Sequence, residues 1–168
     1  MILILDNLRS AHNVGALFRT ADGAGVTHVY LVGITPTPAE PSRLYQTLAQ
    51  KTLAKTALGA ECSISWTSVK SLARLATRLR ADGHELVALE EVDGITAIDY
   101  REWQPKPGKI PALIVGNEVD GLGGKTLALV DSIINLPMRG MKRSLNVSVA
   151  GSIALYHLSA TMEKPQIK

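Results

Sequence analysis

The sequence has little of what marks secreted, membrane-spanning or base-stacking proteins. Cys62 is the single cysteine among 168 residues, so no internal disulfide can form. No apolar run reaches the roughly 18 residues of a membrane span, and the apolar start MILIL lacks the basic residues of a signal peptide. Aromatic residues make up 4%, with Phe18 the only phenylalanine, which leaves little to stack on unpaired bases. We therefore expect a cytoplasmic protein without membrane contact.

Composition and charge are those of an ordinary globular domain. Hydrophobic residues make up 46% and charged residues 20% of the chain, which excludes a disordered protein. The 18 lysines and arginines exceed the 15 acidic residues by three, and the pI is near 9.1. Such an excess permits a polyanionic partner without requiring one. No repeat or linker divides the chain, so we expect a single domain over residues 1–168.

Short β-branched runs alternate with helical patterns along the whole length. This order predicts an α/β fold, with a parallel sheet and helices on both of its faces. The predicted strands are Ile2–Leu5, His28–Val32, Ser63–Trp66, Glu85–Glu90, Ala112–Val115 and Ser132–Leu136. The predicted helices are Val14–Gly25, Arg43–Lys55, Val69–Ala81, Lys125–Val130 and Val147–Glu163. The last helix is apolar around most of its circumference, so it either lies deep in the fold or packs against a second subunit.

Several common sites are excluded by spacing. Gly124-Lys125-Thr126 resembles the end of the phosphate-binding motif G-x-x-x-x-G-K-[ST]. However, Val119 occupies the position where the first glycine is required. No G-x-G-x-x-G follows the first strand, and no G-x-S-x-G is present. The four histidines are scattered and Cys62 has no neighbour at ligand spacing, so we expect no metal site.

Three segments contain more polar residues and glycines than a buried core requires. In the first, Asn13 suits a helix N-cap, and Arg19 lies among apolar neighbours. This segment alone fits a capped amphipathic helix equally well. The other two follow predicted strands, where ligands bind in open α/β sheets. They are Gly116-Asn117-Glu118 with its glycine-rich turn, and the basic stretch 137–146 ahead of the last helix.

Together these segments resemble the SpoU/TrmH family of SPOUT methyltransferases. The family motif N-x-G-x-x-x-R-T-A is matched at Asn13–Ala21, and G-N-E-x-x-G-L at Gly116–Leu122. The third motif, I-P-M-x-G followed by S-L-N-V-S-V-A, is matched over Leu136–Ala150 with leucine in the first place. A weaker patch lies at Lys55–Ala60, where the family often has serine at the position of Ala57. The resemblance runs from residue 1 to about residue 158, with the motifs in the family's order.

The resemblance implies a C-terminal deep trefoil knot and S-adenosylmethionine (SAM) held by the knot loops, around Leu113–Gly121 and Leu136–Asn146. It also implies a homodimer, and a catalytic domain with no separate RNA-binding extension. The cofactor-binding residues it implies are Leu113, Val115, Gly116, Asn117, Gly121, Ile134, Leu136, Met138, Ser144 and Leu145.

The reaction implied is methyl transfer to a ribose 2′-hydroxyl of tRNA or rRNA, and we expect tRNA first. By resemblance Arg19 activates the hydroxyl, from the partner subunit's side of the site. Because a guanidinium stays protonated in proteins, we expect it to polarise the hydroxyl and bind the adjacent phosphate. The other catalytic residues implied are Asn13, Glu118, Ser144 and Asn146, and the RNA-binding residues are Arg139, Lys142 and Arg143. Two alternatives stay open: a base-directed methyltransferase of this fold, and a non-catalytic RNA-binding or assembly protein that has kept it.

Overall fold

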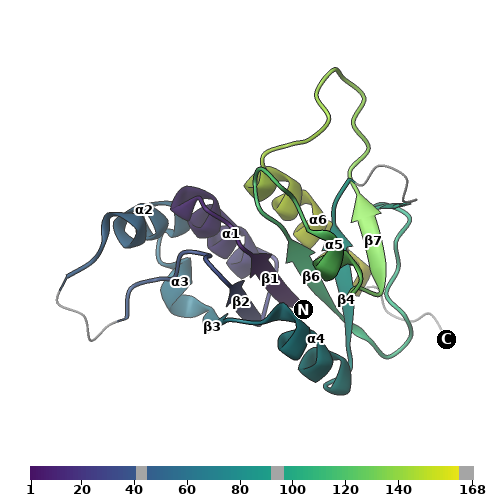
Figure 1. Cartoon of the computed structure of the whole chain (residues 1–168), viewed down its shortest axis with the longest axis horizontal. Helices are drawn as coiled ribbons and strands as arrows, with labels where there is room; N and C mark the ends of the chain where they lie inside the picture. Colours follow the sequence, from purple (N-terminus) through teal and green to yellow (C-terminus); the bar gives the residue numbers. More distant parts are fainter. Residues whose placement is uncertain (41–44, 92–96, 163–168) are drawn as a thin grey trace.

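One seven-stranded, wholly parallel sheet organises the chain (Figure 1). The structure is a computed structural model that describes residues 1–40, 45–91 and 97–162. The strand order across the sheet is β3-β2-β1-β6-β4-β7-β5. The strands are β1 (Ile2–Asp6), β2 (His28–Val32), β3 (Ser65–Val69), β4 (His84–Leu89), β5 (Ile98–Asp99), β6 (Ile110–Val115) and β7 (Ser132–Asn135). Because all strands run the same way, their carboxyl ends meet at one edge, and loops from strands far apart in the sequence become neighbours there.

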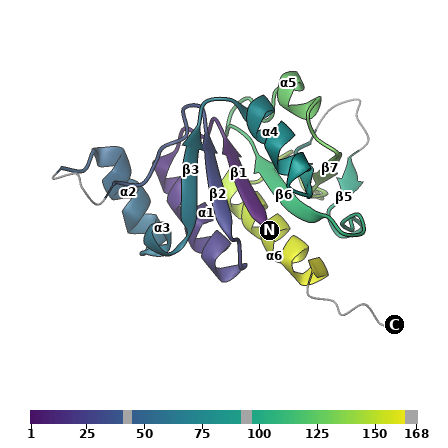
Figure 2. The same cartoon turned by 90° about the horizontal axis from the view of Figure 1, so that it is seen from below.

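Helices cover both faces of the sheet, as the sequence predicts (Figure 2). The helices are α1 (Ala11–Gly23), α2 (Leu48–Ala57), α3 (Ala60–Ser63), α4 (Leu72–Ala81), α5 (Gly124–Leu127) and α6 (Val147–Met162). In Figure 2, α4 and α5 lie above the sheet, while α1 and α6 lie below it. None of the helices within the described ranges is long and apolar enough to cross a membrane.

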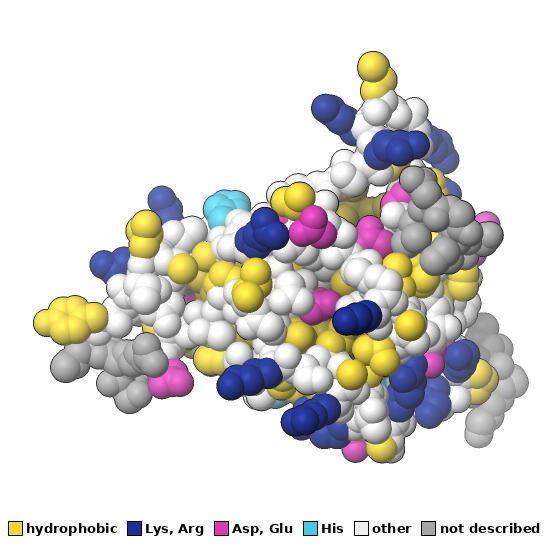
Figure 3. Space-filling view, viewed as in Figure 1, with side chains coloured by type: hydrophobic (Ala, Val, Ile, Leu, Met, Phe, Trp, Pro, Cys, Tyr) yellow, Lys and Arg dark blue, Asp and Glu magenta, His cyan; other side chains and the backbone are white. Residues whose placement is uncertain are grey.

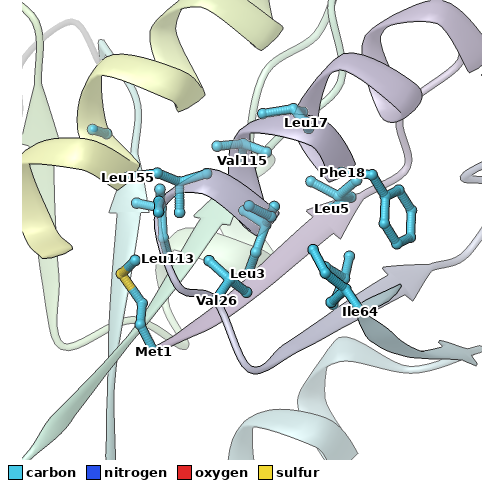
Figure 4. Close-up of a cluster of buried hydrophobic side chains, with 14 of the residues drawn as sticks. Met1, Leu3, Leu5, Leu17, Phe18, Val26, Ile64, Leu113, Val115 and Leu155 are labelled. Carbon is cyan, nitrogen blue, oxygen red and sulfur yellow. The ribbon is translucent and has the colours of Figure 1, made fainter. Parts of the chain in front are cut away.

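The core forms two layers because successive side chains of a strand point to opposite faces. Leu3 and Leu5 of β1 face the layer under α1 and α6, together with Leu113 of β6 (Figure 4). Ile2 and Ile4 face the layer under α4. Apart from Asp6 at the end of β1, the central strands β1 and β6 are apolar, as expected of strands that are covered on both faces. Burial of each such side chain contributes about 1.5–3 kcal/mol, so the middle of the sheet is the stable frame that carries the loops.

Element boundaries shift where local capping overrides periodicity. The predicted strand Ser63–Trp66 was placed too early, because Ala60–Ser63 forms α3 and the strand runs over Ser65–Val69. The predicted helix Val69–Ala81 begins only at Leu72: Ser71 caps it, and Val69 pairs with Val32 in the sheet.

The predicted helix Arg43–Lys55 is α2, which begins later. Thr47 and Gln50 form a reciprocal capping box at its start, so the helix runs over Leu48–Ala57. Residues 43 and 44 of the prediction lie outside the described ranges, as does Glu163 at the end of the last predicted helix.

Asn13 is not the N-cap of α1, contrary to the prediction. Ser10 takes that place, and its hydroxyl accepts a hydrogen bond from the Asn13 N–H at 3.3 Å. The remaining predicted elements differ from the structure by at most three residues at an end, and the two-residue strand β5 was missed. The trefoil knot that the resemblance implies stays a prediction.

Candidate functional site

A cavity of about 310 Å³ opens where the carboxyl ends of β4, β6 and β7 meet the start of α6. Its walls come from the ends of these three strands and from two long loops, residues 116–123 and residues 136–146. The lining residues are Leu89, Glu90, Glu91, Val115, Gly116, Asn117, Glu118, Val119, Gly121, Asn135, Leu136, Met138, Arg143, Ser144, Leu145, Asn146, Val147 and Ala150. The size lies at the lower end of the roughly 300–1,000 Å³ typical of small-molecule sites.

The loop 116–123 is tied down by its own asparagine. The side-chain amide of Asn117 donates to the Asn7 carbonyl at 2.9 Å, and its oxygen accepts from the Val119 N–H at 2.8 Å. The Gly121 N–H closes the turn onto the Asn117 carbonyl at 3.0 Å. The loop therefore keeps one shape, anchored to the chain that leaves β1.

Two glycines of this loop are required by close packing. A Cβ on Gly116 would lie 2.7 Å from the backbone of Gly121, and a Cβ on Gly121 would lie 2.4 Å from Glu90 Oε2. Gly121 also has a φ of +62°, which side chains disfavour. Glu90 Oε2 in turn accepts from the Leu122 N–H at 2.6 Å. The backbone of Gly121 and Leu122 thus packs directly against the Glu90 carboxylate.

Glu118 joins this loop to the N-terminus of α1. Its carboxylate accepts from the N–H groups of Arg9 (2.9 Å) and Ser10 (3.0 Å), and from the side-chain amide of Asn13 (3.0 Å). Partial burial raises the pKa of Glu118, but these hydrogen bonds, led by the one from Arg9, outweigh it, so the pKa is lowered overall. A negative charge at a helix N-terminus also suits the helix dipole.

Asn13 extends this connection to α6. Its side-chain oxygen accepts from the Asn146 amide at 3.2 Å, while the Asn146 oxygen accepts from the Ser148 N–H at 2.9 Å. One chain of hydrogen bonds, Glu118–Asn13–Asn146, therefore joins the three sequence motifs. Three of the five predicted catalytic side chains are in direct contact, and Ser144 lines the same cavity.

The second loop, residues 136–146, is open by contrast. It projects from the body between β7 and α6, with lysine and arginine side chains on it and acidic groups below it (Figures 1 and 3). Arg139, Lys142 and Arg143 are all exposed, and Met141 is fully exposed. Within the described part of the chain, no hydrogen bond or ion pair holds residues 136–145.

Two of the predicted cofactor residues do not reach the cavity with their side chains. Leu113 and Ile134 are fully buried, because their places within β6 and β7 direct them into the layer under α1 and α6. Contact with the cofactor through their backbone groups, which the resemblance implies for Ile134, stays a prediction. The other predicted cofactor residues do line the cavity: Val115, Gly116, Asn117, Gly121, Leu136, Met138, Ser144 and Leu145.

Arg19 also lies outside the cavity of its own chain. It stands six residues beyond Asn13 on α1, which places it about 9 Å along the helix and roughly 120° around it. Its side chain is exposed and none of the described residues forms a hydrogen bond or ion pair with it.

An apolar stripe on α6 runs beside α1. Val149, Ile153 and Tyr156 follow each other at helical spacing and are 48%, 37% and 56% exposed. α6 packs beside α1, where the hydroxyls of Thr20 and Ser152 are 2.7 Å apart. Within this chain, the buried residues of α6 lie on one face only, so the helix does not lie deep in the fold. The alternative, that it packs against a second subunit, stays a prediction.

The cavity also contains residues that sequence reasoning missed. Glu90 and Glu91 follow β4, and Asn135 ends β7. Two acids at the end of a predicted strand were the available signal. However, nothing in the sequence places β4 between β6 and β7, so these acids could not be assigned to the cavity.

The residues that resemble a nucleotide-binding motif form hydrogen bonds and an ion pair within the protein. The Thr126 hydroxyl donates to Asp6 at 2.9 Å, on the carboxyl end of β1. Asp131 accepts from the Leu86 N–H at 2.8 Å and pairs with Arg80 at 3.1 Å. Within the described ranges, no three His, Cys, Asp or Glu side chains gather as metal ligands.

Comparison with known proteins decides the family. The model of the SpoU rRNA methylase family matches residues 1–156. The chain belongs to the SpoU rRNA methylase family. It is 34% identical over 157 residues to a Staphylococcus saprophyticus protein described as a TrmH family tRNA/rRNA methyltransferase. The match covers 94% of this chain and 57% of the relative. It is also 34% identical to a Xanthomonas axonopodis 23S rRNA (guanosine-2′-O-)-methyltransferase, over 93% of this chain and 57% of that one.

Structures of SpoU family members share the fold. The AdoMet-bound rRNA methyltransferase from Sinorhizobium meliloti superposes with a TM-score of 0.80 at 26% identity, covering 97% of this chain and 57% of that one. The chain thus spans a little over half the length of these relatives. The likeness establishes the parallel α/β fold and the family.

Proposed function

We propose that this SpoU-family chain transfers a methyl group from SAM to a ribose 2′-hydroxyl of RNA. The observation that carries the proposal is the hydrogen-bonded chain Glu118–Asn13–Asn146 at the mouth of a strand-end cavity. A fixed polar array of this kind can orient a hydroxyl, which is most of what the reaction needs. The names of the relatives, which include a guanosine-2′-O-methyltransferase, support ribose as the acceptor.

The cavity fits SAM in size and chemistry. Val115, Leu136 and Met138 offer apolar contact for an adenine ring, and the packed glycines keep the opposite wall free of side chains. SAM supplies an electrophilic sulfonium methyl group: transfer forms the bond from this carbon to the 2′-oxygen, breaks its bond to sulfur and releases the hydroxyl proton. The task left to the protein is to position the hydroxyl and to assist that proton's departure.

Arg19 would act from a second copy of the chain. Its distance along α1 keeps it from the cavity of its own chain, and α1 packs beside α6, which carries the exposed stripe Val149–Ile153–Tyr156. Pairing these stripes in a homodimer would bury apolar surface and bring a second chain's α1 to the cavity. There the guanidinium, which carries five donors and no acceptor, would polarise the 2′-hydroxyl and hold the neighbouring phosphate while the proton passes to phosphate or water.

The open loop would supply the contact to RNA. Arg139, Lys142 and Arg143 are exposed and carry no ion pair within the described chain, so they are available to phosphates. A tRNA stem-loop is the first candidate, because its compact fold can present one nucleotide and the flanking phosphates to a single loop. Ribosomal RNA is the second candidate.

The test is methyl transfer from labelled SAM into unmodified tRNA and, separately, rRNA, followed by nucleoside analysis. We expect label in a 2′-O-methylated nucleoside, most strongly from tRNA. Arg19→Ala should lower turnover at least about 100-fold while SAM affinity and thermal stability stay unchanged. Arg101→Ala, which removes an exposed arginine that pairs with Asp99 and does not line the cavity, is the matched control. Label on a base would favour the base-directed alternative, and SAM binding without transfer would favour a non-catalytic RNA-binding protein.

A further inference from the structure

We propose that Glu91 binds the ribose hydroxyls of SAM and that Asn135 holds the Glu91 carboxylate in place for this role. The proposal rests on the SAM site proposed above and concerns two residues that lie outside the three family motifs. Both residues line the cavity, at the carboxyl ends of the adjacent strands β4 and β7.

Most polar side chains of the cavity are already engaged within the protein. Asn117 holds its own loop, Glu118 accepts from the start of α1, and Asn146 bridges Asn13 and the first turn of α6. Glu90 accepts from the N–H groups of Leu122 at 2.6 Å and Glu91 at 3.0 Å. These groups shape the cavity, so a ligand needs other partners for its polar parts.

Of the acidic side chains in the cavity, Glu91 accepts the fewest hydrogen bonds from the described residues. Its Oε2 accepts from the Asn135 side-chain amide at 2.9 Å, and no described residue donates to its Oε1. A carboxylate offers about four acceptor positions and no donor, so the described residues leave at least one full oxygen for a ligand. The Asn135 bond limits the rotation of an otherwise exposed side chain, which lowers the entropic cost of binding.

The chemistry of this free acceptor matches a vicinal diol. The two ribose hydroxyls of SAM are adjacent donors, and an acidic residue beyond a strand end is a recurring partner for ribose hydroxyls in α/β folds. Leu89 and Leu136, the sequence neighbours of the two acids and of Asn135, supply apolar wall beside the carboxylate. An adenosine could therefore place its base on the apolar wall and its diol on Glu91.

The experiment measures binding by calorimetry with two ligands, SAM and 5′-methylthioadenosine. The second ligand keeps adenine and ribose but lacks the amino-acid part. We expect Glu91→Gln to weaken both ligands by the same factor, about 10- to 100-fold for the loss of charged hydrogen bonds. Asn135→Ala should weaken both by a smaller factor. Glu102→Gln, an exposed acid near β5, is the matched control and should change neither.

A third ligand, 5′-methylthioadenosine without its 2′-hydroxyl, completes a double-mutant cycle. It should bind the wild type more weakly than the parent compound does, and the Glu91→Gln variant should discriminate much less between the two. In transfer assays, KM for SAM should rise while kcat at saturating SAM stays nearly constant. A merely structural role would instead lower the melting temperature, which we expect to be unchanged.

Two results would overturn the proposal. A loss of affinity for SAM but not for 5′-methylthioadenosine would place Glu91 on the amino-acid part, and unchanged affinity for both would remove it from the site. The proposed function fails separately: SAM binding without methyl transfer to RNA would overturn that function and leave the ribose contact standing. A wild-type protein that binds neither ligand would overturn both.

Discussion

The two loops that wall the cavity differ in how they are held. Loop 116–123 is fixed by two of its own side chains, Asn117 and Glu118, and by the Glu90 carboxylate after β4, which accepts from the Leu122 N–H. Loop 136–146 has no hydrogen bond or ion pair over residues 136–145 within the described chain, and it carries three exposed cations. Loop 116–123 is therefore preformed without a ligand. Loop 136–146 is free to become ordered when a ligand binds.

The contrast suggests a division of tasks. A preformed wall reduces the ordering that ligand binding must supply, so loop 116–123 suits the cofactor. A projecting basic loop can adapt to a phosphate backbone, and it suits RNA. The hydrogen-bonded chain Glu118–Asn13–Asn146 lies at the border between the two, where the transferred methyl group would pass from one ligand to the other.

The largest difference should come from matched glycine substitutions in the two loops. Gly121→Ala places a Cβ 2.4 Å from Glu90 Oε2 at a φ of +62°, a strain of about 1–3 kcal/mol. We expect a lower melting temperature and at least a tenfold loss of SAM affinity by calorimetry. Gly140→Ala meets nothing within 4 Å and should leave both quantities unchanged. Equal effects at the two positions would contradict the contrast between the loops.

Ligand binding should order the open loop. Since Met138, Arg143, Ser144 and Leu145 line the cavity, SAM should slow tryptic cleavage after Arg139, Lys142 and Arg143 several-fold, because proteolysis follows the population of open conformers. Cleavage after Lys125, in α5 outside the cavity, is the internal control. Mass spectrometry of timed digests measures both. A loop cleaved at the same rate with and without SAM would mean that the ligand does not contact it.

Glu118 should make stability depend on pH. The pKa of Glu118 is lowered in the folded protein from its ordinary value of 4.5, so its contribution is fully present above about pH 4.5 and is lost as the pH falls through the folded value. Glu118→Gln removes this contribution, and because Glu118 is exposed we expect only a small stability loss at pH 7. In urea titrations, the difference between wild type and variant should shrink below pH 4.5. A difference that is constant down to pH 3 would exclude an ionised Glu118 as its source.

The smallest expected effect concerns single cations of the open loop. Lys142→Ala should weaken RNA binding a few-fold and reduce the slope of log affinity against log salt by about 0.7–0.9, the share of one phosphate contact. SAM affinity should not change. Lys109→Ala, in the exposed turn before β6, serves as the control. If the salt slope of Lys142→Ala equals that of the wild type, this side chain makes no phosphate contact.

The sequence could predict those features of the fold that depend on residues close together in the chain. The apolar strand Ala112–Val115 and the predicted helix faces depend on neighbouring residues, and they were identified with small boundary errors. The cap of α1 was misassigned because Ser10 and Asn13 are equally good capping residues, and only the backbone decides between them. The contacts of Glu90, Glu91 and Asn135 depend on β4 lying between β6 and β7, and no local pattern encodes that order.

The site residues show the same limit. Asn13, Glu118 and Asn146, which the motifs single out, are in direct contact, although more than a hundred residues separate Asn13 from the other two. Their catalytic role stays a prediction. The resemblance implied that Arg19 acts from the partner subunit's side, and Arg19 is not among the residues that line the cavity of its own chain. Its catalytic role stays a prediction.

The central claim is that an RNA ribose is methylated at a site shared by two chains, and mixing variants tests it most directly. Arg19→Ala chains and Asn146→Ala chains, each folded and nearly inactive, are unfolded together and refolded so that subunits exchange. A shared site predicts that the mixture regains about a quarter of wild-type methyl transfer to tRNA, since half of random dimers carry one intact site of two. A mixture that stays as inactive as its components, with mixed dimers verified by mass, would contradict the account.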